Sequence, residues 1–183
     1  MQQTYPNVTV TNLELTPMQV NYQGPTDVST TDLGGTLGNV VISTKYMKAN
    51  IMADQLGETV LNRRVSGFQM TVTTALAEIE NKKLFKIIWP HGQFTPAGTK
   101  YFQWNSNIGD DDLSNAGVLN LHPIDRAPSD VSFDITCFKV CASAESEITF
   151  GPKDQAKAKI VWNILPDTSV TPPRFARLGD TTL

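Results

Sequence analysis

The side chains best suited to acid–base or metal chemistry in this sequence are two histidines. His91 follows an apolar segment that ends at Pro90, and His122 precedes Pro123. Neither histidine has a cysteine or a second histidine at the spacing of a zinc site. We therefore interpret both as exposed or hydrogen-bonded turn residues, and we expect no metal site.

Acidic side chains offer a second set of candidates, in the run Asp110-Asp111-Asp112. An EF-hand loop places its ligands at alternate positions and closes with a glutamate, and this run does neither. A solvated loop that repels other charges is the better interpretation. Glu78 and Glu80 lie at the start of an expected helix, where carboxylates interact favourably with the helix dipole, so they need no catalytic explanation.

The motifs of the common enzyme classes do not occur in the sequence. There is no nucleophile elbow, no P-loop and no dinucleotide fingerprint, and Gly34–Gly38 predicts only a turn. Cys137 and Cys141 would lie on one face of a strand about 13 Å apart, too far for a disulfide. We expect free, partly buried thiols, no catalytic residue, no cofactor and no enzyme activity.

An aromatic cluster, Tyr101, Phe102 and Trp104, follows Lys100. Such clusters stack single-stranded bases where many cations line the groove, and one lysine does not make such a groove. We interpret the cluster as a packing or subunit contact. It also supports an alternative function, a β-sandwich module that binds carbohydrate or a host surface.

Composition narrows the function classes further. Charged residues make up only 18% of the 183 residues, the formal net charge is −3, and no basic surface is clustered as nucleic-acid binding requires. No apolar run reaches the length of a membrane span, and the first residues lack the pattern of a secretory signal. We expect a protein made in the cytoplasm that does not bind membranes.

Alternation of apolar and polar residues dominates the chain and predicts strands. The apolar phase jumps after Cys137, which predicts a β-bulge or burial on both faces. A second phase switch, within Val40–Ile51, predicts a long strand pair or a bent strand. The predicted strands are Phe68–Leu76, Val131–Cys137 and Ala158–Ile164, with shorter ones starting at Val8 and spanning Lys100–Trp104.

One segment, Glu78–Gly92, predicts a helix instead. Leu84, Ile87 and Ile88 share one face of it, and Pro90 and Gly92 end it. Many strands and one helix predict a mainly β fold, a β-sandwich of two packed antiparallel sheets with one flanking α-helix.

Long loops and extended termini complete the predicted organisation. We expect loops at Gln23–Gly38, Asn105–Gly117 and Leu165–Leu183. Loops of this length in a small domain are usually functional or disordered. In assembling subunits such arms commonly order against neighbours. The whole chain, 1–183, is predicted to be one domain, with a core at about residues 7–165 and a C-terminal arm at 166–183.

The segment Leu33–Ile88 resembles the tail tube (major tail) proteins of siphophages, the phages with long non-contractile tails. A glycine lead-in, Leu37–Val40, precedes a strand that runs into an Asp-Gln-x-Gly-x-Thr turn, here Asp54–Thr59. A Gly-led amphipathic strand, Gly67–Glu78, then leads into the short helix. The C-terminal stretch is also similar, with a strand ending in Leu165-Pro166-Asp167, then Phe175 and Gly179-Asp180.

The resemblance implies a structural virion protein with a ring-forming tail tube fold. Hexameric rings would join their inner sheets into a β-lined channel and stack into a hollow tube, in the virion tail, after synthesis in the host bacterial cytoplasm. The implied partners are further copies of the chain, the tape measure protein in the lumen, and tail terminator and distal tail proteins at the tube ends. Double-stranded DNA would pass without specific binding. A tail terminator and a contractile-type inner tube protein are the structural alternatives.

Two sets of residues are candidates for the channel lining, and the sequence does not choose between them. A conduit should be neutral or acidic, because each neutralised phosphate adds affinity for DNA. The first set is Gln69, Thr71 and Thr73, and the second is Ser132, Asp134 and Thr136. Asp54 and Gln55, in the turn that contains Gly57, are candidates for the contact between rings.

Overall fold

The computed structural model describes residues 17–52, 59–77, 82–95, 101–104, 108–143, 145–151 and 156–179. The strands are β1 (Met18–Gln23), β2 (Thr31–Asp32), β3 (Val41–Met52), β4 (Val60–Leu76), β5 (Gln93–Thr95), β6 (Tyr101–Gln103), β7 (Gly117–Pro123), β8 (Ile135–Ala142), β9 (Glu147–Thr149), β10 (Lys157–Ile164) and β11 (Ala176–Leu178). The helix is α1 (Lys82–Ile88).

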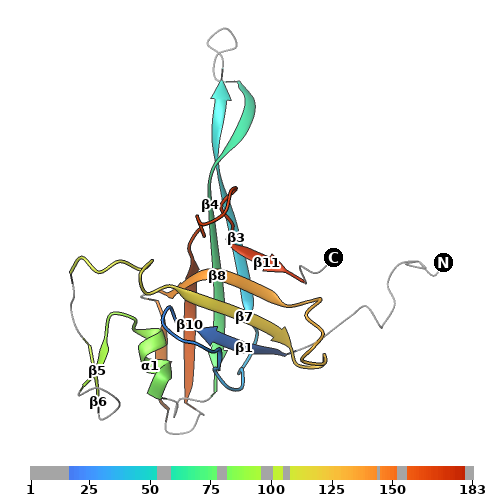
Figure 1. Cartoon of the computed structure of the whole chain (residues 1–183). Coiled ribbons are helices and arrows are strands. Elements are labelled where there is room, and N and C mark those ends of the chain that lie inside the picture. The colour runs from blue at the N-terminus through green and yellow to red at the C-terminus, as the bar shows by residue number, and fades with distance from the viewer. Residues whose placement is uncertain are drawn as a thin grey trace, which may run out of the picture.

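Nine of these strands form one antiparallel sheet. Its order is β2-β1-β7-β8-β10-β4-β3, with β11 beside β8 and β9 beside β10, whereas β5 and β6 form a separate hairpin. In Figure 1, β1, β7 and β8 run across the molecule and β3, β4 and β10 run along it. The mainly β prediction is confirmed, but the two predicted sheets are joined into one by β8. That strand pairs with β7 on one edge and with β10 and β11 on the other.

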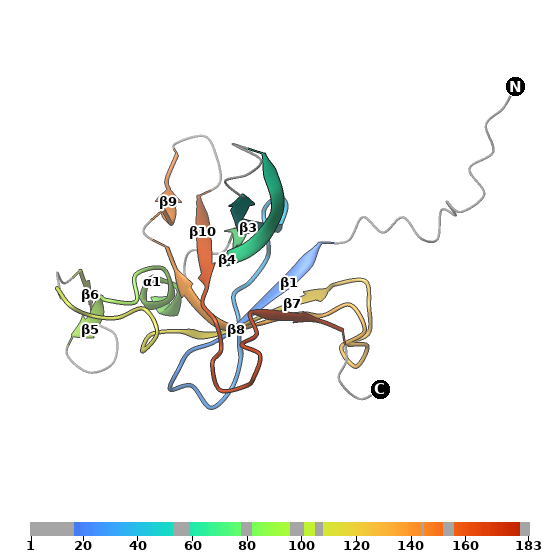
Figure 2. The same cartoon turned by 90° about the horizontal axis from the view of Figure 1, so that it is seen from above.

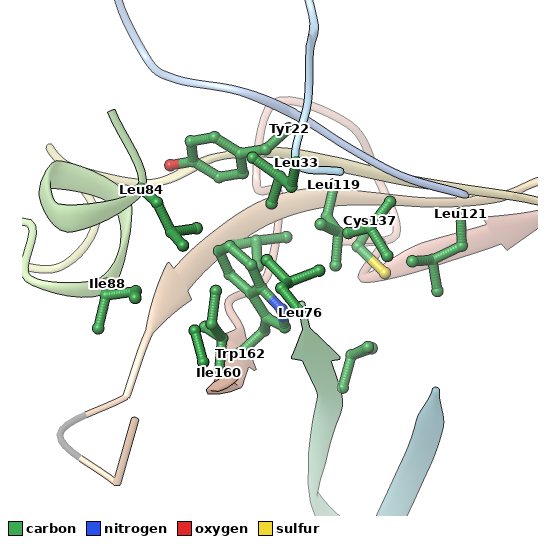
Figure 3. Close-up of a cluster of buried hydrophobic side chains, with 14 of the residues drawn as sticks. Tyr22, Leu33, Leu76, Leu84, Ile88, Leu119, Leu121, Cys137, Ile160 and Trp162 are labelled. Atoms are coloured by element: carbon green, nitrogen blue, oxygen red, sulfur yellow. The ribbon is translucent and has the colours of Figure 1, made fainter. Parts of the chain in front are cut away.

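The core lies where the two halves of the sheet face each other. The even-numbered residues of β4 and β10 point into it, as the alternation predicts: Val72, Thr74, Leu76, Ala158, Ile160, Trp162 and Ile164 are all buried. Trp162 stacks on Tyr22 of β1 with ring centroids 5.4 Å apart. Its indole Nε1 donates a hydrogen bond to Thr74 Oγ1 at 3.0 Å. Figure 3 shows Trp162 among Leu76, Ile160 and Tyr22.

Helix α1 covers one end of this core. Leu84 and Ile88 are buried and Ile87 packs against them, which confirms the predicted apolar face. The helix ends at Ile88, two residues before Pro90, where a proline ring would clash with the preceding turn. Glu78 and Glu80 lie outside the described residues, as does the predicted strand at Val8.

The strand predicted over Val131–Cys137 is placed wrongly. Its first half is a turn, closed by a hydrogen bond from Asp134 N to Val131 O, and β8 starts at Ile135. The predicted bulge is confirmed, because Leu119 of β7 faces Cys137 while Gly117 faces Val140. An extra residue in β8 therefore shifts the alternation of its side chains.

The bulge separates the two cysteines. Cys137, Val140 and Ala142 all pack on the core, so Cys141 points to the other side of β8, not to the same face as predicted. Both thiols are free, as predicted, and both are buried. Burial raises the pKa of Cys137 to about 11 and that of Cys141 to about 12.

The C-terminal residues and the middle of the chain add strands that the sequence pattern did not reveal. The segment 90–130 contributes β5 and β7, which were not predicted, whereas β6 confirms the short strand predicted over Lys100–Trp104. In the segment expected to be an arm, β11 pairs with β8 of the same chain. The order of this segment therefore does not depend on a neighbouring copy.

Replacing Thr74 with valine tests the buried hydrogen bond in the core. Thr74→Val keeps the side-chain shape but leaves Trp162 Nε1 without its acceptor, so we expect a loss of about 1–3 kcal/mol in the free energy of unfolding. Thr73→Val, on the opposite face of β4, is the matched control and should change stability by less than about 0.5 kcal/mol. Urea denaturation measures both, and equal losses would contradict the assignment.

Candidate functional site

The most exposed part of the sheet is a two-stranded ribbon, defined here as β3 together with Val60–Gln69 of β4. β4 is 17 residues long, but only Met70–Leu76 pairs with β10. Over Val60–Gln69, β3 is the only strand paired with β4 among the described residues. Figure 1 shows the ribbon projecting from the body. A free ribbon of this kind is marginally stable in water, so a partner that covers it would stabilise it.

Large apolar side chains are exposed along the ribbon. Tyr46 is 59% exposed and Val65 is 60% exposed. So many exposed large apolar side chains on one ribbon favour an interaction surface over an ordinary solvated face. The other exposed apolar residues on the ribbon are Val41, Ile42, Met47, Met52, Val60 and Leu61.

The apolar residues lie on both faces of the ribbon, and the pairing of its two strands is irregular at two places. The pairing of β3 with β4 shifts after Met47 and again after Ile51, and the extra residues, Ser66 and Leu61, lie in β4. β3 itself alternates regularly, so Ile42 and Tyr46 lie on the core side. Met47, Ala49 and Ile51 lie on the opposite side. The predicted phase switch is thus a long strand pair with apolar residues on both faces.

The ribbon is also basic. Its described residues include Lys45, Lys48, Arg63 and Arg64 and no acidic side chain. The chain as a whole has a net charge of −3, so the remainder is acidic. Opposite charges on two parts of one molecule favour contacts between copies that bring those parts together.

The first lining set lies on one face of β4, opposite the core. Thr71 and Thr73 are half-buried, and Gln69 is exposed. Lys45 of β3 lies directly across from Gln69, so the face is neutral at the two threonines and basic at the glutamine.

The second lining set does not form a strand face. Ser132 lies in the turn before β8, where its hydroxyl donates to Asp130 Oδ1 at 2.5 Å. Asp134 is buried and accepts a hydrogen bond from His122 Nδ1 at 2.6 Å. Thr136 alone belongs to β8. Asp134 and Thr136 both accept hydrogen bonds from Asn120 Nδ2, so these two side chains lie on the same side of the sheet. The predicted strand is wrong over Ser132 and Asp134, because the alternation continued by chance into a turn. The place of the set in a channel lining stays a prediction. Asp54 and Gln55 lie outside the described residues.

Both histidines bond to carboxylates. His122 lies in β7 rather than in the predicted turn, whereas His91 lies in a turn with Nδ1 3.4 Å from Asp110 and Nε2 3.3 Å from Asp112. Neither pairing could be predicted from a local pattern, because the partners are 12 to 21 residues apart in the sequence. Among the described residues, no group of three or more His, Cys, Asp and Glu could hold a metal.

An apolar groove of about 430 Å³ lies where the ribbon meets β11. Phe68 contacts Tyr46 and Phe175, with ring centroids 4.9 and 4.7 Å away. The groove is lined by Ile42, Phe68, Met70, Ile135, Arg174, Phe175, Ala176, Arg177 and Leu178.

Asp167 stabilises the turn between β10 and β11, next to this groove. Its carboxylate accepts hydrogen bonds from Ser169 Oγ at 2.7 Å and from Arg174 Nε at 2.9 Å. The Ser169 hydrogen bond and then that of Arg174 lower the pKa of Asp167 to about 2. The Arg174 guanidinium also lies 3.8 Å from the centre of the Phe138 ring.

Within the described residues, no helix is long and apolar enough to cross a membrane.

The lowered pKa of Asp167 makes a prediction about acid stability. The folded state holds this carboxylate ionised, so its contribution is complete above the unfolded pKa of about 4 and is lost as the pH falls toward 2. Asp167→Asn should lower the urea midpoint at pH 6 and flatten the fall in stability between pH 4 and pH 2. Unfolding curves over that range measure this, and an unchanged pH slope would contradict it. Asp130 titrates in the same window, so some slope remains in the variant.

Comparison with known proteins yields only distant structural similarities. No protein-family model matches the sequence, and no curated protein matches it either. Among solved structures, the chain is similar to one in the cryo-EM structure of the anti-feeding prophage (AFP) baseplate, 6-fold symmetrised. The TM-score is 0.47 and the sequence identity 8%, over 99% of this chain and 100% of that chain. A similarity at this level does not establish a common fold or function.

Proposed function

We propose that this chain is a structural subunit that joins further copies through its ribbon into closed rings, which stack into the tube of a siphophage tail. The observation that carries the proposal is a long ribbon that has apolar side chains on both faces and, among the described residues, two open edges. The resemblance of Leu33–Ile88 to siphophage tail tube proteins supports the same function.

The open edges favour a head-to-tail contact. β3 is the last strand of the sheet and is 12 residues long, and Val60–Gln69 of β4 has its second edge open within the described part of the chain. Long unprotected edges pair with other strands. If β3 of one copy pairs with the open edge of β4 in the next, the sheet continues from subunit to subunit. Such an interface produces a ring when the rotation closes, and closure removes every such edge.

The apolar residues supply the driving force for this contact. Each large side chain that leaves water on association contributes roughly 1–2 kcal/mol. Association itself costs at least several kcal/mol in lost freedom of motion. Eight exposed apolar residues on the ribbon are enough to offset that cost when most of them are covered. The basic charge of the ribbon, against an otherwise acidic chain, adds complementarity between copies.

Thr71 and Thr73 are the residues that we assign to the channel. Their face of β4 is uncharged there and points away from the core. Lys45 and Gln69 lie further out on the ribbon, where an acidic surface of a neighbouring copy would neutralise the lysine. In this arrangement the tape measure protein fills the lumen, DNA passes through it without specific binding, and terminator and distal tail proteins close the ends. A tail terminator would instead give isolated rings by electron microscopy.

Charged substitutions on the ribbon test the assembly. Met47→Asp and Val65→Asp place carboxylates in the proposed apolar contact, so we expect folded monomers where the unmodified protein forms rods. Negative-stain microscopy and sedimentation velocity measure this. Val28→Asp is the matched control, because Val28 is fully exposed outside the ribbon, and it should assemble normally. Normal rods from both ribbon variants would overturn the proposal, as would an unmodified protein that remains monomeric at millimolar concentration.

An arginine in the channel tests the lining. Thr71→Arg and Thr73→Arg would add phosphate contacts along the path of DNA, so ejection from particles should slow and become more dependent on salt. Rods should remain intact. Thr26→Arg, in an exposed loop, is the control and should eject at the normal rate. Unchanged ejection kinetics in both lining variants would exclude this face from the channel.

A further inference from the structure

A second feature lies away from the ribbon, at the lobe formed by α1, the β5–β6 hairpin and the residues that precede β7. Figure 2 shows the lobe beside the body, on the side away from β1 and β11. A pocket of about 450 Å³ opens there, within the size range of small-molecule sites. The side chains that matter for its chemistry are Trp89, His91, Trp104, Asp112, Ser143 and Asn163.

Aromatic rings form one wall of this pocket. Trp104 packs edge-to-face on Trp89, with centroids 5.4 Å apart at 73°, and on Phe102, at 5.4 Å and 87°. These contacts fix the indole of Trp104, yet the residue stays 61% exposed. A fixed indole with an open surface is unusual in a monomer and is suited to stacking on a flat ligand.

A second part of the lining is a turn held by hydrogen bonds and close packing. The ammonium of Lys86 donates hydrogen bonds to the carbonyls of Pro90 and Gly92, the second at 2.7 Å. Gly92 lies so close to Phe102 that a Cβ there would be 2.2 Å from the ring. The turn therefore presents His91 in a defined position, between Asp110 and Asp112.

Polar groups in the pocket match hydroxyls rather than a charged ligand. Asn163 provides an amide and Ser143 a hydroxyl, and Asp112, with its side chain half exposed, can accept further hydrogen bonds. The carboxylates of Asp110 to Asp112 repel phosphate and other anions, which excludes nucleotides and single-stranded nucleic acid. The carboxylates of Asp110 and Asp112 already lie beside His91, so the pocket is less suited to a cationic ligand than to a neutral one.

We propose that this pocket binds a neutral pyranose sugar, with the apolar face of the sugar stacked on Trp104 and its hydroxyls bonded to Asp112, Ser143 and Asn163. A pyranose presents a ring of C–H groups on one face and hydroxyls at its rim, which is the combination of surfaces that the pocket offers. None of the pocket residues belongs to the ribbon, so the proposal does not depend on the contact between copies. Asn163 pairs with Thr71, so this edge of the pocket lies next to the face that we assign to the channel.

Tryptophan fluorescence tests the proposal on the unmodified protein. The probes are maltopentaose, cellopentaose, mannopentaose and chitopentaose, and choline chloride tests a cationic ligand, each up to about 10 mM, where even weak sites bind. Trp162 is fully buried and serves as an unresponsive reference. We expect at least one oligosaccharide to produce a saturable change in emission and choline to produce none.

Variants assign the change to the pocket. Trp104→Ala should weaken sugar binding by about tenfold or more, as truncation of a stacking aromatic does. Asn163→Ala should weaken binding several-fold without changing the tryptophans. Tyr101→Ala is the matched control, because Tyr101 is an exposed aromatic outside the pocket, and it should bind normally. The proposal is overturned if no oligosaccharide changes the emission or if choline alone binds. It is also overturned if Trp104→Ala abolishes rods and no sugar changes the emission of the unmodified protein, since the aromatic wall is then a subunit contact.

Discussion

The fold depends on the double pairing of β8. One edge of this strand pairs with β7 and the other with β10 and β11, so a single strand belongs to both halves of the sheet. Its bulge turns Cys137 and Val140 to the same core despite their odd spacing. The two apolar faces can then meet around Trp162, and this contact fixes β4 and β10 in place. The ribbon follows as a consequence, because β10 ends at Ile164 while β4 extends ten residues beyond the last pair with it.

The elements that could be predicted from the sequence are those with one buried face and one face that is more exposed. β4 and β10 each have one buried face and one exposed or half-buried face, so their alternation is clear, and the apolar stripe of α1 is equally readable. β7 was not predicted, because its last three residues, Leu121 to Pro123, are all buried and hide the period. Ser132 and Asp134 were misplaced for the opposite reason, since a turn there happens to alternate. The sequence also could not show that the apolar residues of the ribbon are exposed. A buried strand has the same alternation of apolar and polar residues.

The candidate sites depended on contacts between distant residues, which a single sequence does not encode in any local pattern. His122 with Asp134, and His91 with Asp110 and Asp112, are brought together only by the register of β7 with β8 and by the fold of the lobe. The aromatic residues at Tyr101 to Trp104 were recognised as a cluster from the sequence, but Trp89, which completes the wall, lies across a turn. The proposed assembly contact lies on the ribbon, whereas the proposed sugar site lies at the lobe.

The two extra residues in β4 have a geometric consequence for any assembly built from the ribbon. A bulge increases the local twist of a strand pair. Ser66 and Leu61 therefore set the direction in which the open edges point relative to the body. In a head-to-tail chain of subunits that direction fixes the angle from each copy to the next, and hence the circumference at which the last copy meets the first. In the proposed ring, these two inserted residues would therefore contribute to the size of the central opening.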